Sequence, residues 1–388
     1  DNCTRKNGLV VAGEKQLRYG EIAAEASLLA VPVVKLREAG EWRLIGKSQK
    51  RLDLFDKING KAKYGLDIQF PGLLTAVVAR SPVFGGTVKS FDASATKKIS
   101  GIRHVVEIPS GIAIVGDHYW AVKSGREALK IEWDLGPDKI EDSKLLRDSY
   151  SKLALTPGKA SQQRGEITGS LEKAITKIDT EFVLPYLAHA PMEPLNCTVK
   201  IAKGKWEIWS GTQSPLPHQA EVAAFLGVSP EQVAFNTPYI GGSFGRRGSL
   251  GSDWVMEAVH IAKACGESIK LVWSREDDIK GGGYRPAYLH RVSIGVNDSS
   301  IPVAWRHRIV GQSLFINTPL EKEMIANGID YTSISGVHGS PYFDSIENHS
   351  IELHTTSSNI PVLAWRSVGH SHTAFVMESL IDELAFMG

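Results

Sequence analysis

The segment NTPYIGGSFGRRG (residues 236–248) gathers glycines and arginines between an expected strand and an expected helix. Glycine lets backbone amides approach an anion closely, and the start of a helix adds positive dipole. Arg246 and Arg247 could pair with a phosphate. The pattern matches neither GxGxxG nor a P-loop, which ends in GK[ST]. Its residues therefore leave two alternatives open, an anion-binding turn and a tight turn with surface arginines.

Two segments before this loop carry further polar candidates. In GTQSPLPHQ (211–219), Gln213 could hydrogen-bond in a cleft and His218 could titrate, but capping of the next helix by Thr212 or Ser214 is the favoured interpretation. In AHAPMEPLN (188–196), His189 and Glu193 offer two metal ligands, and the spacing reveals no third ligand. A rigid, proline-bounded loop with a locally bonded histidine is favoured there.

Three candidates follow the loop. Glu276, Asp277 and Asp278 in SREDDIKGGGYRP (274–286) suggest either a divalent-cation site or, preferably, a solvated turn. In AWRSVGHSH (364–372), Arg366 could hold a carbonyl or an anion, and His370 and His372 alternate as some metal ligands do. The last helix carries Glu378 and Asp382 one turn apart, which indicates a solvated face more readily than an acid–base pair.

Composition narrows the class of protein. The chain is 388 residues long, a length typical of two or three domains. Its residues are 42% hydrophobic and 22% charged with a net charge of +1, values typical of a globular protein. No charge excess favours nucleic acid or an anionic membrane, and no apolar run is long enough to span one. Cys3, Cys197 and Cys265 lie far apart, which argues against a cysteine-held metal and a disulfide framework.

The elements expected to position these candidates fall into four stretches. Residues 1–50 are a lead-in with a helix at 19–29 and extended pieces at 31–36 and 41–46, 51–136 form a compact α+β unit, 137–170 are a polar linker, and a second domain starts near 171. In that second domain we expect helices at 169–179, 217–227, 252–266 and 374–386, and strands at 180–186, 197–202, 205–211, 233–235 and 268–274. Gly227 and Gly266 are expected to end two of these helices. The helix at 252–266 should carry an apolar face with Val255, Ala258, Val259, Ala262 and Cys265, and a polar face with Glu257, His260 and Lys263.

In their order along the chain, the motifs resemble the large subunit of the xanthine dehydrogenase/aldehyde oxidase family. RLDLFDKINGKAKYGLDIQFPGLLTAVVARSP (51–82) resembles the start of its α/β hammerhead domain. The likeness continues nearly to the end of the chain through these segments: HAPMEPLNCTV, GTQSPLPHQAEVAAFLGV, TPYIGGSFGRRG, WSREDDIKGGGYRP and WRSVGHSHTAFVMESLIDELA. The arginine pair looks most like the isoquinoline 1-oxidoreductase β-subunit branch. The resemblance implies an α+β fold, with a hammerhead domain over 51–136 followed by a truncated molybdopterin-binding domain over 171–388.

The resemblance also implies a chemistry. Members hydroxylate an electron-poor carbon of an N-heterocycle or an aldehyde with oxygen from water, and the electrons leave through iron–sulfur clusters on a small [2Fe-2S] partner subunit. The cofactor would be molybdopterin in its cytosine dinucleotide form. Its dithiolene holds the molybdenum, so a protein metal-ligand motif is not required. A non-catalytic binding module on the same scaffold is the alternative. A nicotinamide dehydrogenase is disfavoured, because the dinucleotide fingerprint is missing.

Matched motif by motif, the resemblance assigns site residues. Gln213 matches the glutamine close to the cofactor, Phe244 and Gly245 the pair beside the molybdenum, and Arg366 the substrate-facing arginine. The remaining residues assigned to cofactor binding are Gly241, Gly242, Ser243 and Arg246. Trp365 and Ser367 depart from the family's Phe and Gly around Arg366, which puts the substrate geometry in doubt.

One family element is missing from the sequence. The family's catalytic glutamate lies in a GVGE-type segment, and this chain has none. Together with the start at Asp1 and the end just after a helix, this leads us to expect a fragment that is inactive and weakly cofactor-binding by itself. The expected compartment stays open between periplasm and cytoplasm, because an export signal would lie upstream.

Overall fold

The computed structural model describes residues 3–136, 142–202, 204–249 and 251–388, which divide into two compact units between Lys61 and Ala62. In the described part of the first unit, three short antiparallel strands precede helix α1 (Tyr19–Ala26), and α2 (Leu54–Ile58) comes later. The strands are β1 (Cys3–Lys6), β2 (Leu9–Ala12) and β3 (Lys15–Arg18). The extended pieces expected at 31–36 and 41–46 form no strands, because neither has a strand to pair with.

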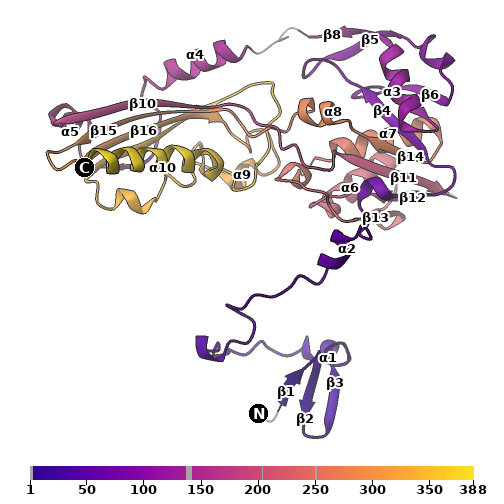
Figure 1. Ribbon diagram of the computed structural model, residues 1–388, viewed down its shortest axis with the longest axis horizontal. Coiled ribbons are helices and arrows are strands. Elements are labelled where there is room, and N and C mark those ends of the chain that lie inside the picture. Colours follow the sequence, from indigo (N-terminus) through magenta and orange to yellow (C-terminus); the bar gives the residue numbers. More distant parts are fainter. Residues whose placement is uncertain (1–2, 137–141, 203, 250) are drawn as a thin grey trace. The chain divides into compact units, whose positions relative to one another are not determined.

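A mixed sheet forms the first part of the second unit (Figure 1). Over the described residues its strand order is β13-β12-β11-β14-β4-β7-β6. The bounds are β4 (Leu74–Ala79), β6 (Ile102–Ile108), β7 (Gly111–Gly116), β11 (Asn196–Ala202), β12 (Lys205–Trp209), β13 (Val233–Asn236) and β14 (Ile269–Val272). The sheet therefore joins strands from the expected α+β unit to strands from the expected second domain through the parallel pair β14–β4.

Helices α3 (Tyr119–Ala128), α6 (Pro215–Leu226) and α7 (Asp253–Cys265) pack on this sheet. On the apolar face of α7, Val255, Ala258, Val259 and Ala262 are fully buried and Cys265 is half-buried, and the helix packs against β11 and β14, as its spacing predicts. Glu257 is the exception to its expected polar face: it is buried and bonds Arg80 and the indole of Trp273. Gly227 and Gly266 end α6 and α7 in the left-handed conformation, as expected.

A second sheet carries the later part of the chain. In the described ranges its order is β10-β15-β16-β19-β9, and helix α10 (His370–Met387) lies along it (Figure 1). The bounds are β9 (Lys159–Arg164), β10 (Thr176–Leu184), β15 (Tyr288–Val296), β16 (Pro302–Gln312) and β19 (Asn348–Thr356). Val376, Met377 and Leu380 of α10 pack with strand residues in one buried core. Apart from the strand expected at 180–186, which overlaps β10, this sheet was not expected from the sequence.

The structure differs from the expected elements in three further places. The helix expected at 169–179 is split into α5 (Ile167–Lys173) and the start of β10, because β10 pairs along its whole length with β15. The expected linker at 137–170 contains α4 (Ser143–Leu153) and β9 in its described part, while residues 137–141 lie outside the described residues. The acidic turn after β14 is helix α8 (Arg275–Lys280), which Ser274 caps.

The remaining elements are small. β5 (Thr87–Asp92) pairs with β8 (Lys130–Asp134), β17 (Ile325–Ala326) pairs with β18 (Ile329–Asp330), and α9 (Glu321–Met324) is one turn long. The α+β class expected from the sequence is confirmed as a mixture of helices and sheets. The domain boundaries drawn from the sequence stay predictions.

Candidate functional site

Two segments far apart in the sequence meet at an open cavity. The loop after β13 and the turn before α10 are joined by a backbone hydrogen bond from Arg366 N to Phe244 O, at 2.7 Å. The cavity measures about 510 Å³, within the usual range for small-molecule sites. It is lined by Gln213, Ser243, Phe244, Gly245, Gly248 and residues 363–368. Five of the residues assigned from the sequence, Gln213, Ser243, Phe244, Gly245 and Arg366, therefore lie around one cavity.

The backbone around this cavity is held in unusual conformations. Phe244, Ser367 and Val368 have φ values of 54°, 69° and 48°, although none of them is glycine. Such conformations cost free energy, most of all for a β-branched residue such as Val368, and they persist where surrounding contacts enforce them. Ser367 stands at a position where the family resemblance expects glycine, so the local backbone retains a glycine-like conformation without the glycine.

Aromatic rings hold the turn that carries Arg366. The indole of Trp365 stacks on the ring of His189 with centroids 4.8 Å apart, and on the ring of Phe244 with centroids 6.2 Å apart. His189 also bonds the carbonyl oxygen of Ala364 through Nε2, at 3.0 Å. Burial lowers the pKa of His189, which favours the neutral ring. His189 is thus hydrogen-bonded to a residue distant in the sequence, whereas a local bond within its own loop had been expected.

The glycines have a different role from the one expected. A Cβ added to Gly241 would meet the side chain of Glu193, and one added to Gly242 would meet Pro191. At Gly245, where φ is 120°, it would meet the carbonyl oxygen of Ala364. The chain itself therefore explains all three glycines, and Gly241 and Gly242 are not among the residues that line the cavity.

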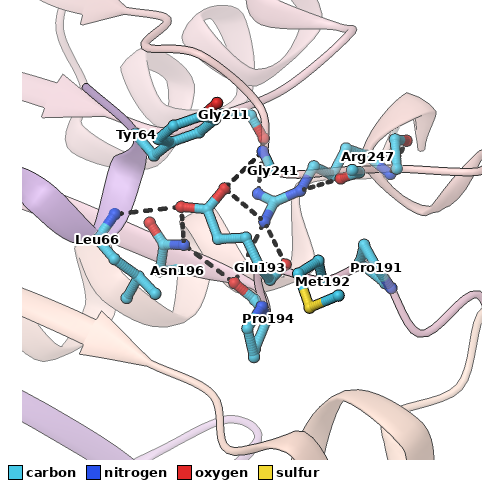
Figure 2. A network of polar contacts seen from close by, with 12 residues as sticks. Tyr64, Leu66, Pro191, Met192, Glu193, Pro194, Asn196, Gly211, Gly241 and Arg247 are labelled. Atoms are coloured by element: carbon cyan, nitrogen blue, oxygen red, sulfur yellow. Dashed lines mark hydrogen bonds and ion pairs between the residues drawn. The ribbon is translucent and has the colours of Figure 1, made fainter. Parts of the chain in front are cut away.

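The arginines match neither alternative that the sequence left open, because both are buried and bonded within the protein instead of lying on the surface or being free to bind a phosphate. The side chain of Arg246 is buried and forms an ion pair with Asp253 at 2.5 Å. Arg247 is completely buried beneath the loop, where Glu193 lies beside it (Figure 2). Burial lowers the pKa of Arg247, and the charge of Glu193 opposes that effect. Runs of charge in a sequence do not reveal whether the side chains turn inward, so this outcome could not be predicted.

Arg247 connects three loops through its guanidinium. Nε donates to Gly242 O at 3.0 Å, Nη1 to Gly211 O at 2.9 Å, and Nη2 to Glu193 O at 2.9 Å. Nη2 also contacts Pro194 O and the Glu193 carboxylate. That carboxylate accepts from the backbone nitrogens of Gly241 and Leu66 and from the Asn196 amide (Figure 2). We call Arg247 and Glu193 the buried clamp; sequence reasoning had noticed both residues but did not pair them.

Arg247 of the buried clamp also bonds the backbone of Gln213. The backbone oxygen of Arg247 accepts from Gln213 N at 2.9 Å and from Thr212 Oγ1 at 3.1 Å. Ser214, the residue before α6, makes no side-chain cap, so the capping interpretation favoured for this segment is wrong for Ser214. Thr212 instead accepts from Ser214 N while it donates to Arg247. His218 is buried and bonds Ser249 O, and burial lowers its pKa.

The other candidates lie outside the cavity. Asp277 pairs with Arg126 and Asp278 with Arg275, while Glu378 and Asp382 lie on the exposed face of α10, as expected. His372 is buried in a chain of imidazoles with His290 and His307, whereas His370 is exposed. Among the described residues, no group of three or more His, Cys, Asp or Glu side chains is arranged to hold a metal ion.

Two further observations concern the rest of the described chain. A more apolar cavity of about 530 Å³ lies between α4 and strands β10 and β15, and it contains none of the residues assigned from the sequence. Within the part of the chain that is described, none of the helices combines the length and the apolar character that a membrane crossing requires.

Several known proteins are similar to this chain in sequence or in fold. The family described as the molybdopterin cofactor-binding domain matches residues 153–387. The isoquinoline 1-oxidoreductase subunit beta of Brevundimonas diminuta is 31% identical over 94% of this chain and 47% of its own length. Quinoline 2-oxidoreductase from Pseudomonas putida 86 superposes with a TM-score of 0.68 and 16% identity, over 89% of this chain and 48% of its own. Aldehyde oxidoreductase from Desulfovibrio gigas gives 0.62 and 17%, over 86% and 41%.

The family match and the relative that is 31% identical define the class of protein, a chain that carries a molybdopterin cofactor-binding domain. The chain belongs to the molybdopterin cofactor-binding family of xanthine dehydrogenase and aldehyde oxidase relatives, as its motifs predicted. The chain spans about half the length of the curated relatives it matches.

Proposed function

We propose that this chain provides one wall of the active site of a molybdenum hydroxylase, which oxidises an N-heterocycle or an aldehyde. The observation that carries the proposal is the meeting of Gln213, Phe244 and Arg366 around one cavity. In the overall reaction, a substrate C–H becomes C–OH with oxygen from water, and two electrons and two protons are released. The electrons would pass to a small [2Fe-2S] subunit.

The residues around the cavity suit an anionic, oxygen-rich group such as molybdopterin. Among the described residues, none accepts a hydrogen bond from Gln213 Nε2, while its Oε1 accepts from Ser243 at 2.5 Å. The guanidinium of Arg366 is exposed. Gln213, whose amide nitrogen has no acceptor among the described residues, and the exposed Arg366 therefore line the same cavity. When bound, the cofactor in its cytosine dinucleotide form would supply the oxygen-transfer and electron-accepting chemistry.

The protein's own residues would bind and orient the reactants. Gln213 Nε2 would donate to an oxygen of the cofactor, and Arg366 would hold a carbonyl or an anionic group of the substrate. The ring of Phe244, 44% exposed, would cover one face of the site and exclude water. We further propose that residues 51–136 correspond to the hammerhead domain of the family.

The test is the reaction of the protein expressed from its native gene. Molybdenum and pterin are measured first, and then N-heterocycles and aldehydes are offered with an electron-accepting dye in isotopically labelled water. The proposal expects labelled oxygen in the product, and a weaker substrate affinity in Arg366→Ala than in the matched Arg306→Ala, whose arginine lies on β16. Cofactor-loaded protein that oxidises neither class would contradict it.

A further inference from the structure

We propose that Ser243 is a positioning residue that fixes the orientation of the Gln213 amide, so that its nitrogen, and not its oxygen, is offered to the cofactor. The inference rests on the proposed function and deepens it, because it names the residue that decides what Gln213 presents. It follows from counting the donors and acceptors at a single hydroxyl group, half-buried beside the cavity.

The Ser243 hydroxyl has two lone pairs and one proton. Gly245 N donates to Ser243 Oγ at 3.2 Å, and Arg247 N donates to the same atom at 3.1 Å. These two backbone donors use both lone pairs. The hydroxyl therefore has only its proton left for a third partner, and that partner must be an acceptor.

Gln213 is that third partner. Its side chain reaches Ser243 Oγ at 2.5 Å. If the amide were turned over, three N–H donors would point at an oxygen with two lone pairs, and the serine proton would lose its acceptor. Amide orientations are normally assigned from the hydrogen-bond network, and here the network permits one of the two. Oε1 consequently faces Ser243, and Nε2 stays available beside the cavity.

The buried clamp also helps to fix this orientation of the Gln213 amide. Arg247 supplies one of the two donors to Ser243, and its own backbone oxygen accepts from Gln213 N at 2.9 Å. The guanidinium of Arg247 is fixed by carbonyl oxygens of three loops. Both ends of the Ser243–Gln213 bond are thus attached to one buried residue, which limits how far either can turn.

The distinction between nitrogen and oxygen has a direct test in Gln213→Glu. The carboxylate has the shape of the amide and can still accept from Ser243, but it places an oxygen where Nε2 stood. We expect Gln213→Glu to lower cofactor retention at least as much as Gln213→Leu, about tenfold for one lost hydrogen bond. Retention by Gln213→Glu at the wild-type level would overturn the assigned orientation.

The role of Ser243 is tested by variants at that position in the protein expressed from its native gene. Ser243→Ala should lower pterin retention about tenfold, whereas Ser243→Thr, which keeps the hydroxyl, should restore it. Ser214→Ala, a nearby hydroxyl that bonds Gly248 O, should have no effect. Because Ser243 acts through Gln213, the double variant Ser243→Ala/Gln213→Leu should lose no more than either single one. Fully additive losses would overturn the inference.

A second measurement does not depend on the cofactor. In protein labelled with ¹⁵N-glutamine, the side-chain amide signal of Gln213 is identified by its loss in Gln213→Leu. We expect Ser243→Ala to shift this signal and to speed its hydrogen exchange, and Ser243→Thr to leave both near the wild-type values. An unchanged signal in Ser243→Ala would overturn the inference. If Ser243→Ala shows the expected shift but wild-type protein contains no pterin, the result contradicts the proposed function alone.

Discussion

The backbone nitrogen of Arg366 lies 2.7 Å from the backbone oxygen of Phe244, and this one hydrogen bond joins the two segments whose motifs pointed to the same site. Gly245 allows the approach, because a side chain there would meet Ala364 O. Trp365 stacks on His189 and on Phe244 and so adds to the contact between the two segments. The cavity is therefore built by packing within this chain.

The close approach at Gly245 predicts a loss of stability in Gly245→Ala. A residue with a side chain is strained at φ 120°, and the added methyl group also meets a carbonyl oxygen, so we expect a loss of about 3 kcal/mol or more in the free energy of unfolding. Urea unfolding measures it. The control Gly266→Ala, at φ 69° with open space around it, should lose about 1–2 kcal/mol. Equal losses in both variants would argue against the contact with Ala364.

The buried clamp predicts strong coupling between two positions. Arg247→Met leaves the Glu193 carboxylate without its cation and several carbonyl oxygens without a donor, so the free energy of unfolding should fall by about 3–5 kcal/mol. Adding Glu193→Gln should cost less in that background than in the wild type. Lys89→Met, which breaks an exposed ion pair with Glu132, should leave the unfolding midpoint unchanged. Additive effects of Arg247→Met and Glu193→Gln would refute the pairing.

The chain of imidazoles formed by His307, His290 and His372 predicts instability in acid. Burial lowers the pKa of His307 to about 3 and holds those of His290 and His372 well below the usual value. Below about pH 6.5 the unfolded chain therefore binds more protons than the folded chain. The free energy of unfolding should fall with decreasing pH, by about 1.4 kcal/mol per pH unit for each such histidine, until its folded pKa is reached.

Urea unfolding at several pH values between about 5 and 7.5 measures that slope. His307→Gln should reduce the slope by about 1.4 kcal/mol per pH unit, the contribution of one proton, because one buried imidazole has been removed. His370→Gln, which changes an exposed histidine of α10, should leave the slope as it is. The same slope in wild type and His307→Gln would show that His307 is protonated in the folded state.

The stacked rings predict a role for Trp365 in placing Arg366. Trp365→Ala removes the contacts with His189 and Phe244, and should lower the free energy of unfolding by about 1–3 kcal/mol, because the side chain is only partly buried. Trp365→Phe keeps a ring and should recover most of that loss. Limited proteolysis should cut within residues 363–369 faster in Trp365→Ala. Equal cleavage in the two variants would argue that stacking does not hold the turn.

How much the sequence reveals depends on the range of the interactions. Gly227, Gly266 and the apolar stripe of α7 are local signals, and the structure confirms them. The five-stranded sheet depends on pairing between distant segments such as β9 and β19, which periodicity does not reveal.

The same distinction holds at the site. The structure places Gln213, Phe244 and Arg366, which the ordered motifs assigned to one site, around one cavity, and their roles there stay predictions. Arg247 turns inward toward Glu193, which is distant in sequence, so a phosphate role for Arg247 is wrong. A Cβ on Gly241 would also meet Glu193, while the cofactor-binding assignment of Gly241 stays a prediction. A charge or a glycine in a sequence identifies a possible contact but not its partner.

The central claim is that the cavity lined by Gln213, Phe244 and Arg366 is a molybdopterin site. The most direct measurement is the molybdenum and pterin content of the protein expressed from its native gene, in wild type, in Gln213→Leu and in the control Gln16→Leu, whose glutamine is exposed on β3. We predict matching amounts of molybdenum and pterin in wild type and control, and a clear loss in Gln213→Leu. Wild-type protein without either component, or equal content in all three proteins, would contradict the claim.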